Sequence, residues 1–289
     1  MVELLQYLIG GLVVGSIYGL VGIGYTGVYN VTRIVNFAQG DFAMLGAMSA
    51  IALFELGLPL PVAIAAGIAG VAAVGAAVER WAIRPARADE VRGIIITLGV
   101  GAFLQGLAVT VWGTDARTLP AFSGDRPLWL GGVTVPPQAL WVLGTAAVLV
   151  AGLHLFFRAT YLGKAFRACA VNPYAARLSG IDVRTMSVIS FVLSGGLGAV
   201  AGIIVAPIVL AQYDTGIPLG IKGFVACIVG GLGKPTGAAM GGLLLGVLEA
   251  LATGLGSSGY KNAIAFVLLL VFLFVRPGGL FGELERVER

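Results

Sequence analysis

Residues 60–78 read LPVAIAAGIAGVAAVGAAV, a stretch in which no side chain carries a charge. An α-helix needs about 20 mostly apolar residues to cross the hydrocarbon core of a bilayer, so this stretch predicts a membrane-spanning helix. Similar candidate spans lie near 4–28, 36–56, 60–83, 93–112, 139–157, 185–211, 217–232, 237–255 and 261–275. The sequence therefore predicts an all-α polytopic membrane protein with about 8–9 transmembrane helices.

The composition of the whole chain agrees with this prediction. The 289 residues are 58% hydrophobic and 11% charged, with a mean hydropathy of +0.98. Because a soluble domain is about 25% charged, this composition excludes an ordinary soluble enzyme, a disordered protein and a nucleic-acid-binding protein. The 45 glycines are also typical of membrane proteins, in which small residues let helices pack closely.

Two candidate spans are unusual because they are short or polar at one end. The stretches 36–46 and 217–232 are candidates for broken or re-entrant helices, which a membrane protein tolerates where the backbone is buried or lines a cavity. Each follows a span with glycines at four-residue spacing: Gly11, Gly15 and Gly19, and then Gly198 and Gly202. An offset of five spans reverses the chain direction, so the pattern fits an inverted repeat; chance spacing in a glycine-rich chain fits it as well.

The basic residues indicate which ends of the spans face the cytoplasm, because cytoplasmic loops carry an excess of Lys and Arg. Most of the 18 basic residues fall on one side of the predicted membrane: Arg33, Arg80, Arg84, Arg87, Arg92, Arg158, Lys164, Arg167, Arg177, Arg184, Lys234, Arg276, Arg286 and Arg289. The opposite side holds Arg117, Arg126, Lys222 and Lys261. With nine spans, this distribution predicts a cytoplasmic C-terminus and a periplasmic N-terminus.

The chain offers few groups for catalysis. His154 is predicted at the inner end of a span as an interfacial residue, and Cys169 and Cys227 have no spacing typical of a metal site. The run GGLGKPT at 230–236 departs twice from the nucleotide-binding pattern G-x-x-x-x-G-K-[ST], at Ile228 and at Pro235. We therefore expect no enzymatic activity, no metal and no cofactor in this chain, and ATP dependence would have to come from another chain.

Polar residues inside apolar spans are costly, so each is a candidate for the translocation path. Asn36, Gln39 and Asp41 form a polar run directly after Arg33, where Asn36 and Asp41 suit helix N-cap positions and the helix start could face a pathway. Glu249 is predicted in the middle of a span. Its carboxylate would serve either in proton coupling or as a hydrogen-bonded group that holds helices together.

The cytoplasmic loop 158–184 contains complete signals for a short helix. Asn172 suits the N-cap, Pro173 fits the first helical position, 174–179 can form two turns, and Gly180 is a natural stop. Such a helix, lying along the membrane face among basic residues, is predicted to dock a partner protein. The alternative is a solvated linker that binds anionic lipid.

Three motifs together resemble one known family. The stretch 34–47, IVNFAQGDFAMLGA, resembles the hallmark of the LivH-type permeases of bacterial branched-chain amino acid ABC transporters. The glycines at 230–242 resemble a second signature of these permeases, and RPGGLFG at 276–282 is similar to their usual ending. The resemblance covers essentially the whole chain, and it implies that 1–289 form one transmembrane permease domain in the inner membrane.

The resemblance also implies a set of partners. These are a homologous second permease, two cytoplasmic ATPases that bind ATP and magnesium, and a periplasmic protein that delivers Leu, Ile or Val. On this basis the loop 158–184 holds a coupling helix that contacts an ATPase through Asn172, Pro173, Ala175, Ala176, Arg177 and Gly180. Beyond these proteins, membrane lipid is expected as a partner and nucleic acid is not.

Two other functions stay open at this point. Related families that transport urea and short amides share the architecture that the resemblance implies. A stand-alone secondary carrier coupled to protons through Glu249 would belong to a different class. The candidate path is Asn36, Gln39, Asp41 and Glu249, and its low charge suits a weak substrate site in a transporter whose selectivity lies in a separate binding protein.

Overall fold

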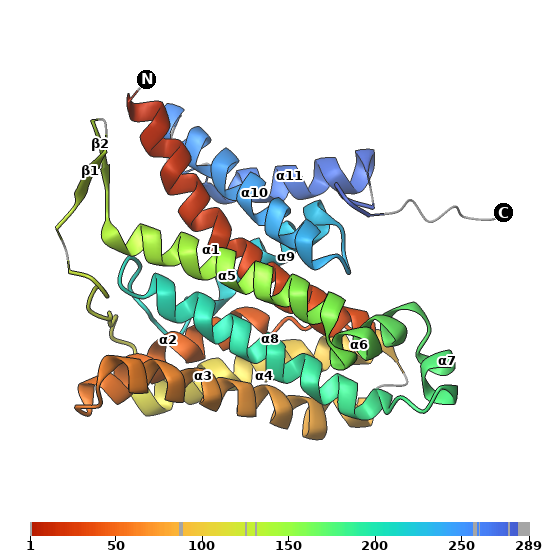
Figure 1. Ribbon diagram of the computed structural model, residues 1–289. Helices are drawn as coiled ribbons and strands as arrows, with labels where there is room; N and C mark the ends of the chain where they lie inside the picture. The colour runs from red at the N-terminus through yellow and green to blue at the C-terminus, as the bar shows by residue number, and fades with distance from the viewer. Residues whose placement is uncertain are drawn as a thin grey trace.

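The computed structural model describes residues 2–86, 89–124, 126–130, 132–256, 259, 261–276 and 278–282. Most of this part is helical (Figure 1). The α-helices are α1 (Val2–Thr32), α2 (Gln39–Glu55), α3 (Leu60–Ala77), α4 (Glu90–Trp112), α5 (Pro137–Ala159), α6 (Tyr161–Val171), α7 (Pro173–Leu178), α8 (Val183–Val205), α9 (Gly216–Gly230), α10 (Pro235–Leu255) and α11 (Lys261–Val275). The prediction of an all-α chain is confirmed in outline.

Every predicted span coincides with a helix, but the predicted count of spans is not established. Six helices of the described residues are long and apolar enough to cross a membrane: α1, α3 with its continuation to Ile83, α4, α5, α8 and α10. The stretches 36–46 and 217–232 fall on α2 and α9, which are each one unbroken helix of 17 and 15 residues. The chain is a multi-pass membrane protein.

Some elements have no counterpart in the prediction. α3 continues as a π-helical turn, η1 (Val78–Ile83), and a 3-10 turn, η2 (Arg84–Ala86). A small antiparallel hairpin of β1 (Leu128–Leu130) and β2 (Val133–Val135) precedes α5. α6 lies in what was predicted to be a loop, and Thr160 caps it by accepting a hydrogen bond from Gly163 N at 2.9 Å.

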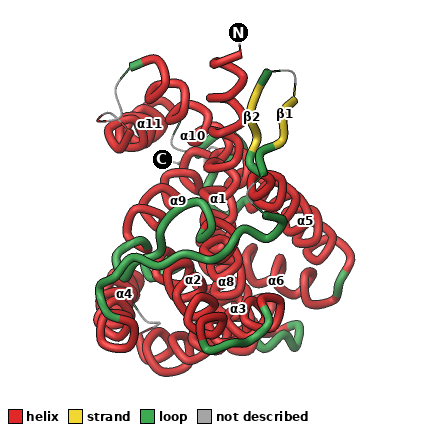
Figure 2. The backbone as a smooth tube through the Cα atoms, turned by 90° about the vertical axis from the view of Figure 1, so that its left-hand side faces the viewer, coloured by secondary structure: helices red, strands yellow, loops and turns green. Residues whose placement is uncertain are grey.

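The helices lie side by side and give the molecule two distinct ends. Figure 1 shows the start of α1 and the β-hairpin at one end, and α6 and α7 at the other. In Figure 2, α1, α2 and α8 occupy the middle of the bundle, while α4, α5 and α11 lie at its periphery. The largest fully buried side chains include Tyr25, Phe42 and Phe191, which come from α1, α2 and α8. The core therefore lies between these central helices.

Glycines hold the central helices at very short distances. A β-carbon added to Gly15 of α1 would lie 2.7 Å from the carbonyl oxygen of Gly242 in α10. A β-carbon added to Gly195 of α8 would lie 2.8 Å from the carbonyl oxygen of Val71 in α3. Since neither backbone can retreat without disturbing its helix, both contacts require glycine.

A second pair of glycine contacts has the same sequence separation between the two halves of the chain as Gly15 and Gly195. Gly22 of α1 approaches Gly223 of α9, while Gly202 of α8 approaches Ala43 of α2. Gly22 and Gly202 are as far apart in sequence as Gly15 and Gly195. In Figure 1, α1 runs from the hairpin end toward α6, and α8 runs in the opposite sense. The contact of α1 with α10 thus corresponds to the contact of α8 with α3, and the two corresponding helices α1 and α8 run in opposite directions.

Candidate functional site

The polar segment between α1 and α2 enters the protein interior. α1 ends at Thr32, and Arg33 has a left-handed backbone conformation with a φ of 60° that turns the chain. Asn36 and Gln39 are completely buried, and Asp41 is only 4% exposed. Three of the four residues predicted for the pathway therefore lie on one buried turn at the centre of the bundle.

The predicted capping roles of Asn36 and Asp41 are wrong. α2 begins at Gln39 with Ala38 at the N-cap position, and no side chain caps this helix. Asn36 contributes its backbone carbonyl, which accepts a hydrogen bond from Gln39 N at 3.0 Å. Asp41 lies within the first turn of α2, where a carboxylate is favoured by the partial positive charge of the helix start.

Gln39 joins α2 to α8 through both ends of its amide. Its Nε2 donates a hydrogen bond to the carbonyl oxygen of Ser194 at 3.0 Å, and its Oε1 accepts one from the Ser194 hydroxyl. Gly24 of α1 makes room for this amide, because a β-carbon at Gly24 would overlap with it. Gln39 thus lies where α1, α2 and α8 meet, and all of its polar atoms have partners in the protein.

Asp41 joins α2 to α4. Its Oδ1 accepts a hydrogen bond from Gln105 Nε2 at 2.8 Å. Two glycines border the carboxylate: a β-carbon at Gly101 of α4 would lie 2.5 Å from its Oδ2, and one at Gly216 of α9 would lie 2.7 Å from its Oδ1. Gln105 was not among the predicted site residues, since an amide near a span end gives no signal by itself; the structure makes it the partner of the pathway carboxylate.

Asn36 differs from its neighbours because its side chain has no partner among the described residues. The amide is 0% exposed, and neither its Oδ1 nor its Nδ2 makes a hydrogen bond there. The adjacent backbone is well held, since Phe37 N donates to Thr97 Oγ1 at 3.1 Å. Leaving a buried donor or acceptor unpaired costs about 1–3 kcal/mol, so this conformation of the chain carries a local penalty at Asn36.

Glu249 lies apart from this segment and pairs with a lysine. Lys222 Nζ of α9 donates to Glu249 Oε1 of α10 at 2.5 Å, and the two side chains are 8% and 2% exposed. Tyr18 of α1 interacts with the same carboxylate, and Lys222 Nζ lies 5.3 Å from the centre of its ring. Lys222 was counted from the sequence among the basic residues of the opposite side; the structure places its charge inside the helix bundle, paired with Glu249.

The short helix predicted in the loop 158–184 is confirmed as α7. Asn172 Oδ1 accepts hydrogen bonds from Tyr174 N and Ala175 N, both at 3.0 Å, and Pro173 opens the helix. Gly180 follows the helix with a φ of +82°, the left-handed conformation that favours glycine at this position. Local signals alone therefore define both ends of α7.

The two faces of α7 have different environments. Ala176 is 4% exposed and packs in a cluster with Val31, Phe166, Cys169, Val183 and Met186. Tyr174 and Leu178 are 71% and 74% exposed, one helical turn apart, and Arg177 is exposed beside them. The face available to a partner is therefore Tyr174, Arg177 and Leu178, whereas Ala176 supports the helix from beneath. Tyr174 and Leu178 were not predicted, although their four-residue spacing was a usable signal.

Two groups next to α7 have shifted acidities. Burial raises the pKa of the Cys169 thiol, which the nearby charge of Arg177 opposes. Asp182 caps α8, and its pKa is lowered mainly by a hydrogen bond from the Thr185 hydroxyl at 2.6 Å. Asp182 therefore stays ionised at neutral pH and caps the start of α8.

One hydrogen bond links the polar segment to the helices around α7. Arg33 Nη2 donates to the carbonyl oxygen of Ala170 in α6 at 2.6 Å, and the guanidinium lies over the Tyr29 ring. Two residues separate Arg33 from Asn36, and one separates Ala170 from Asn172. The contact therefore joins the residues just before the buried polar turn to the end of α6, just before α7.

The described residues hold no group of three His, Cys, Asp or Glu side chains that could bind a metal ion. The cysteines Cys169 and Cys227 are both buried as free thiols. The residues Arg87, Arg286 and Arg289, predicted on the cytoplasmic side, lie outside the described part of the chain.

Comparisons with known proteins identify relatives over almost the full length. The family model described as "Branched-chain amino acid transport system / permease component" matches residues 7–273. The chain is 34% identical to the high-affinity branched-chain amino acid transport system permease protein LivH of Salmonella typhimurium, over 98% of this chain and 97% of the relative. It is 33% identical to BraD of Pseudomonas aeruginosa over 98% of each chain.

More distant similarities extend the same pattern. The ribose import permease protein RbsC of Escherichia coli is 30% identical over 89% of this chain and 82% of its own. Among solved structures, PsaBC from Streptococcus pneumoniae in complex with Fab superposes with a TM-score of 0.53, covering 97% of this chain and 94% of that chain at 15% identity. This last likeness concerns the fold alone.

Proposed function

The chain belongs to the family of permease components of branched-chain amino acid transport systems, and from this premise we propose the role of its parts in import. It is the membrane subunit of an ABC importer, and ATP hydrolysis is carried out by separate subunits. The substrates that we propose are Leu, Ile and Val, which the names of the relatives from Salmonella typhimurium and Pseudomonas aeruginosa support.

We propose that this chain pairs with a homologous second permease in the bacterial inner membrane. Two cytoplasmic ATPases, which bind ATP and magnesium, dock beneath the pair, and a periplasmic binding protein delivers the amino acid. The distribution of charge supports a cytoplasmic location of the α6–α7 end, since Arg158, Lys164, Arg167 and Arg177 lie there. The N-terminus, at the opposite end in Figure 1, is then periplasmic and the C-terminus cytoplasmic.

Within a single permease domain, 1–289, we assign the loop 158–184 as the coupling segment. The observation that carries this assignment is that α7, a helix capped by Asn172 and exposed on one face, follows directly on α6, whose Ala170 carbonyl accepts a hydrogen bond from Arg33 just before the buried polar turn. Asn172, Pro173 and Gly180 define the helix, Ala175 and Arg177 contact the ATPase together with Tyr174 and Leu178, and Ala176 anchors the helix to α1 and α8.

The translocation path passes the buried turn with Asn36, Gln39 and Asp41. In the conformation described, these side chains are buried between α1, α4 and α8. The unpaired amide of Asn36 destabilises this conformation locally, so a conformation in which the amide finds a partner would be favoured at this position. The matched contacts of Gly15 and Gly195 support an inverted repeat, in which the two halves rock against each other. Movement of α7 would shift Arg33 and open the turn.

The test of this function is uptake into proteoliposomes that hold this chain with its second permease and ATPases. We expect uptake of leucine to require ATP on the side of the membrane that carries the ATPases and the binding protein on the opposite side. Isoleucine and valine should compete with leucine for uptake. Competition by urea or acetamide instead of these amino acids would support the alternative amide permease.

A proton-coupled carrier that uses Glu249 would behave differently. Its uptake would follow an imposed proton gradient without ATP, and Glu249→Gln would abolish this coupling. The ion pair of Glu249 with Lys222 supports a structural role for this carboxylate instead. We therefore expect a proton gradient alone to drive no uptake.

A further inference from the structure

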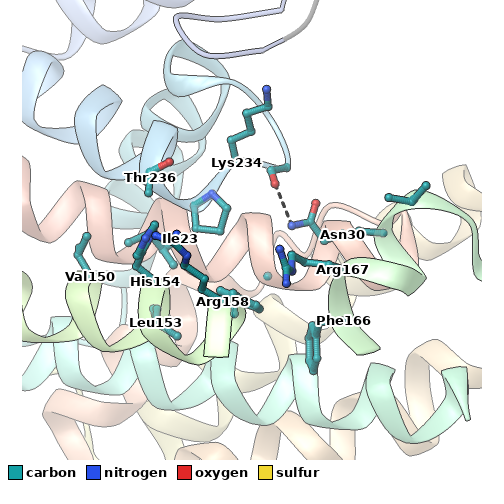
Figure 3. Close-up of a pocket in the computed structure, with 16 residues that line it drawn as sticks. Ile23, Asn30, Val150, Leu153, His154, Arg158, Phe166, Arg167, Lys234 and Thr236 are labelled. Carbon is teal, nitrogen blue, oxygen red and sulfur yellow. Dashed lines mark hydrogen bonds between the residues drawn. The ribbon is translucent and has the colours of Figure 1, made fainter. Parts of the chain in front are cut away.

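A cavity of about 570 Å³ lies at the α6–α7 end of the bundle (Figure 3). Its walls are formed by the last turns of α1 and α5, by α6 and by the start of α10. Asn30 of α1 fixes one wall, because its Nδ2 donates to the carbonyl oxygen of Gly233 at 2.9 Å. The cavity is therefore a built feature of the fold between four helices.

The polar part of this cavity is basic. Arg158 at the end of α5 and Arg167 in α6 both line it, together with His154 one turn before Arg158. No acidic residue lines the cavity, and neither guanidinium has a carboxylate partner in the described part of the chain. Lys234 also lines it, but Figure 3 shows its ammonium group extending away from both guanidinium groups. Two arginines can therefore meet an anion here.

The remainder of the cavity is apolar and runs along the helices. Ile23, Val150, Leu153, Phe157 and Phe166 line it. Because Ile23 and Asn30 both contribute, the cavity extends about 10 Å along α1 at 1.5 Å per residue. An anion-binding rim with an apolar channel of this length matches a phosphate headgroup followed by the upper part of an acyl chain.

We propose that this cavity binds one anionic phospholipid of the membrane leaflet next to α6 and α7. Its phosphodiester lies between Arg158 and Arg167, and an acyl chain runs along Leu153 and Phe157. Basic pockets between helices at a membrane face bind anionic headgroups by such contacts. A choline headgroup fits less well, because its quaternary ammonium would face the same two guanidinium groups. None of Asn36, Gln39, Asp41 and Glu249, and no residue of α7, lines this cavity.

The test uses the complete importer, stripped of lipid in detergent and titrated with dioleoylphosphatidylglycerol, with retained lipid counted by native mass spectrometry. We expect one tightly retained lipid in the wild type, and a loss of affinity of about 30-fold in Arg158→Ala/Arg167→Ala. The variant Arg158→Lys/Arg167→Lys keeps both charges and should retain most of the binding. Lys164→Ala removes a cation of α6 that does not line the cavity, and should change nothing.

Three outcomes would overturn the proposal. The first is equal retention of dioleoylphosphatidylglycerol by the wild type and by Arg158→Ala/Arg167→Ala with the complex intact. The second is equal retention of dioleoylphosphatidylcholine. The third is full displacement of the lipid by millimolar inorganic phosphate, which would identify the site as one for a soluble anion without a need for the apolar channel.

Discussion

The Arg33 guanidinium donates a hydrogen bond to the backbone carbonyl oxygen of Ala170, with 2.6 Å between the two atoms. These residues are 137 positions apart in sequence, and each is close to one of the two segments for which we propose a role in transport. Arg33 precedes the buried turn with Asn36, and Ala170 precedes α7. A displacement of α7 that also moves the end of α6 would therefore reach the turn through this one short contact.

Suitable substitutions of Arg33 can remove its hydrogen bond to Ala170 without disturbing the left-handed backbone conformation of this residue. Gly and Asn both tolerate the left-handed conformation of Arg33, so Arg33→Gly and Arg33→Asn should leave the fold intact and remove only the guanidinium. We expect ATP hydrolysis to continue while leucine uptake per ATP falls about fivefold, which corresponds to about 1 kcal/mol, the net contribution of one typical hydrogen bond. Unchanged uptake per ATP in both variants would show that this contact transmits nothing.

The pair of Lys222 and Glu249 is predicted to stabilise the chain without taking part in transport. Glu249→Gln leaves a buried ammonium with a weaker partner and should cost up to about 3–5 kcal/mol of stability, seen as a lower unfolding temperature. The double variant Lys222→Leu/Glu249→Leu removes both charges and should recover most of this loss. If Glu249→Gln unfolded normally but lost uptake, the carboxylate would belong to the transport path.

Replacement of Asn36 should have the opposite effects to replacement of Glu249: it should stabilise the chain and slow transport. Asn36→Leu replaces an unpaired buried amide by an apolar group of similar size, which should raise the stability of this conformation by about 1–3 kcal/mol. Because the same change removes the polar group from the turn, we expect slower leucine uptake at unchanged subunit assembly. A lower unfolding temperature would mean that the amide has a partner in the resting state.

The glycine contacts predict matched effects in the two halves. Gly15→Ala and Gly195→Ala each place a methyl group against the backbone of another helix, and each should cost about 1–3 kcal/mol through overpacking. Gly10→Ala and Gly99→Ala are controls, since a β-carbon at either position meets nothing within 4 Å. Unfolding temperatures in detergent compare the four variants. Equal stability of all four would contradict the close packing.

The sequence predicts α7 well because its signals are local. Asn172, Pro173 and Gly180 act on groups only a few residues away, and the structure has each in the predicted role. The apolar spans are equally visible, because length and hydropathy alone define them. Their glycine spacing was ambiguous in sequence, since a repeat is distinguished from chance only by which helix each glycine contacts.

Long-range contacts explain the predictions that failed. Asn36 and Asp41 look like helix caps, but the fold turns Asp41 toward Gln105, 64 positions away. A lone cation such as Lys222 is costly in an apolar stretch, and the sequence does not show its partner, because Glu249 lies 27 positions later on another helix. In each case the role of the side chain depends on a partner from a different helix, which only the packing of the helices places next to it.

If α7 couples this permease to its ATPases, as we propose, the ATPases are retained on affinity purification of this chain from membranes only while the exposed face of α7 is intact. Arg177→Glu reverses a charge on the exposed face of α7, while Lys164→Glu makes the same change on α6 as a matched control. We predict that Arg177→Glu loses the ATPases and ATP-driven leucine uptake with membrane insertion intact, and that Lys164→Glu keeps both. Full retention of the ATPases and of uptake in Arg177→Glu and in Tyr174→Glu/Leu178→Glu would contradict the claim.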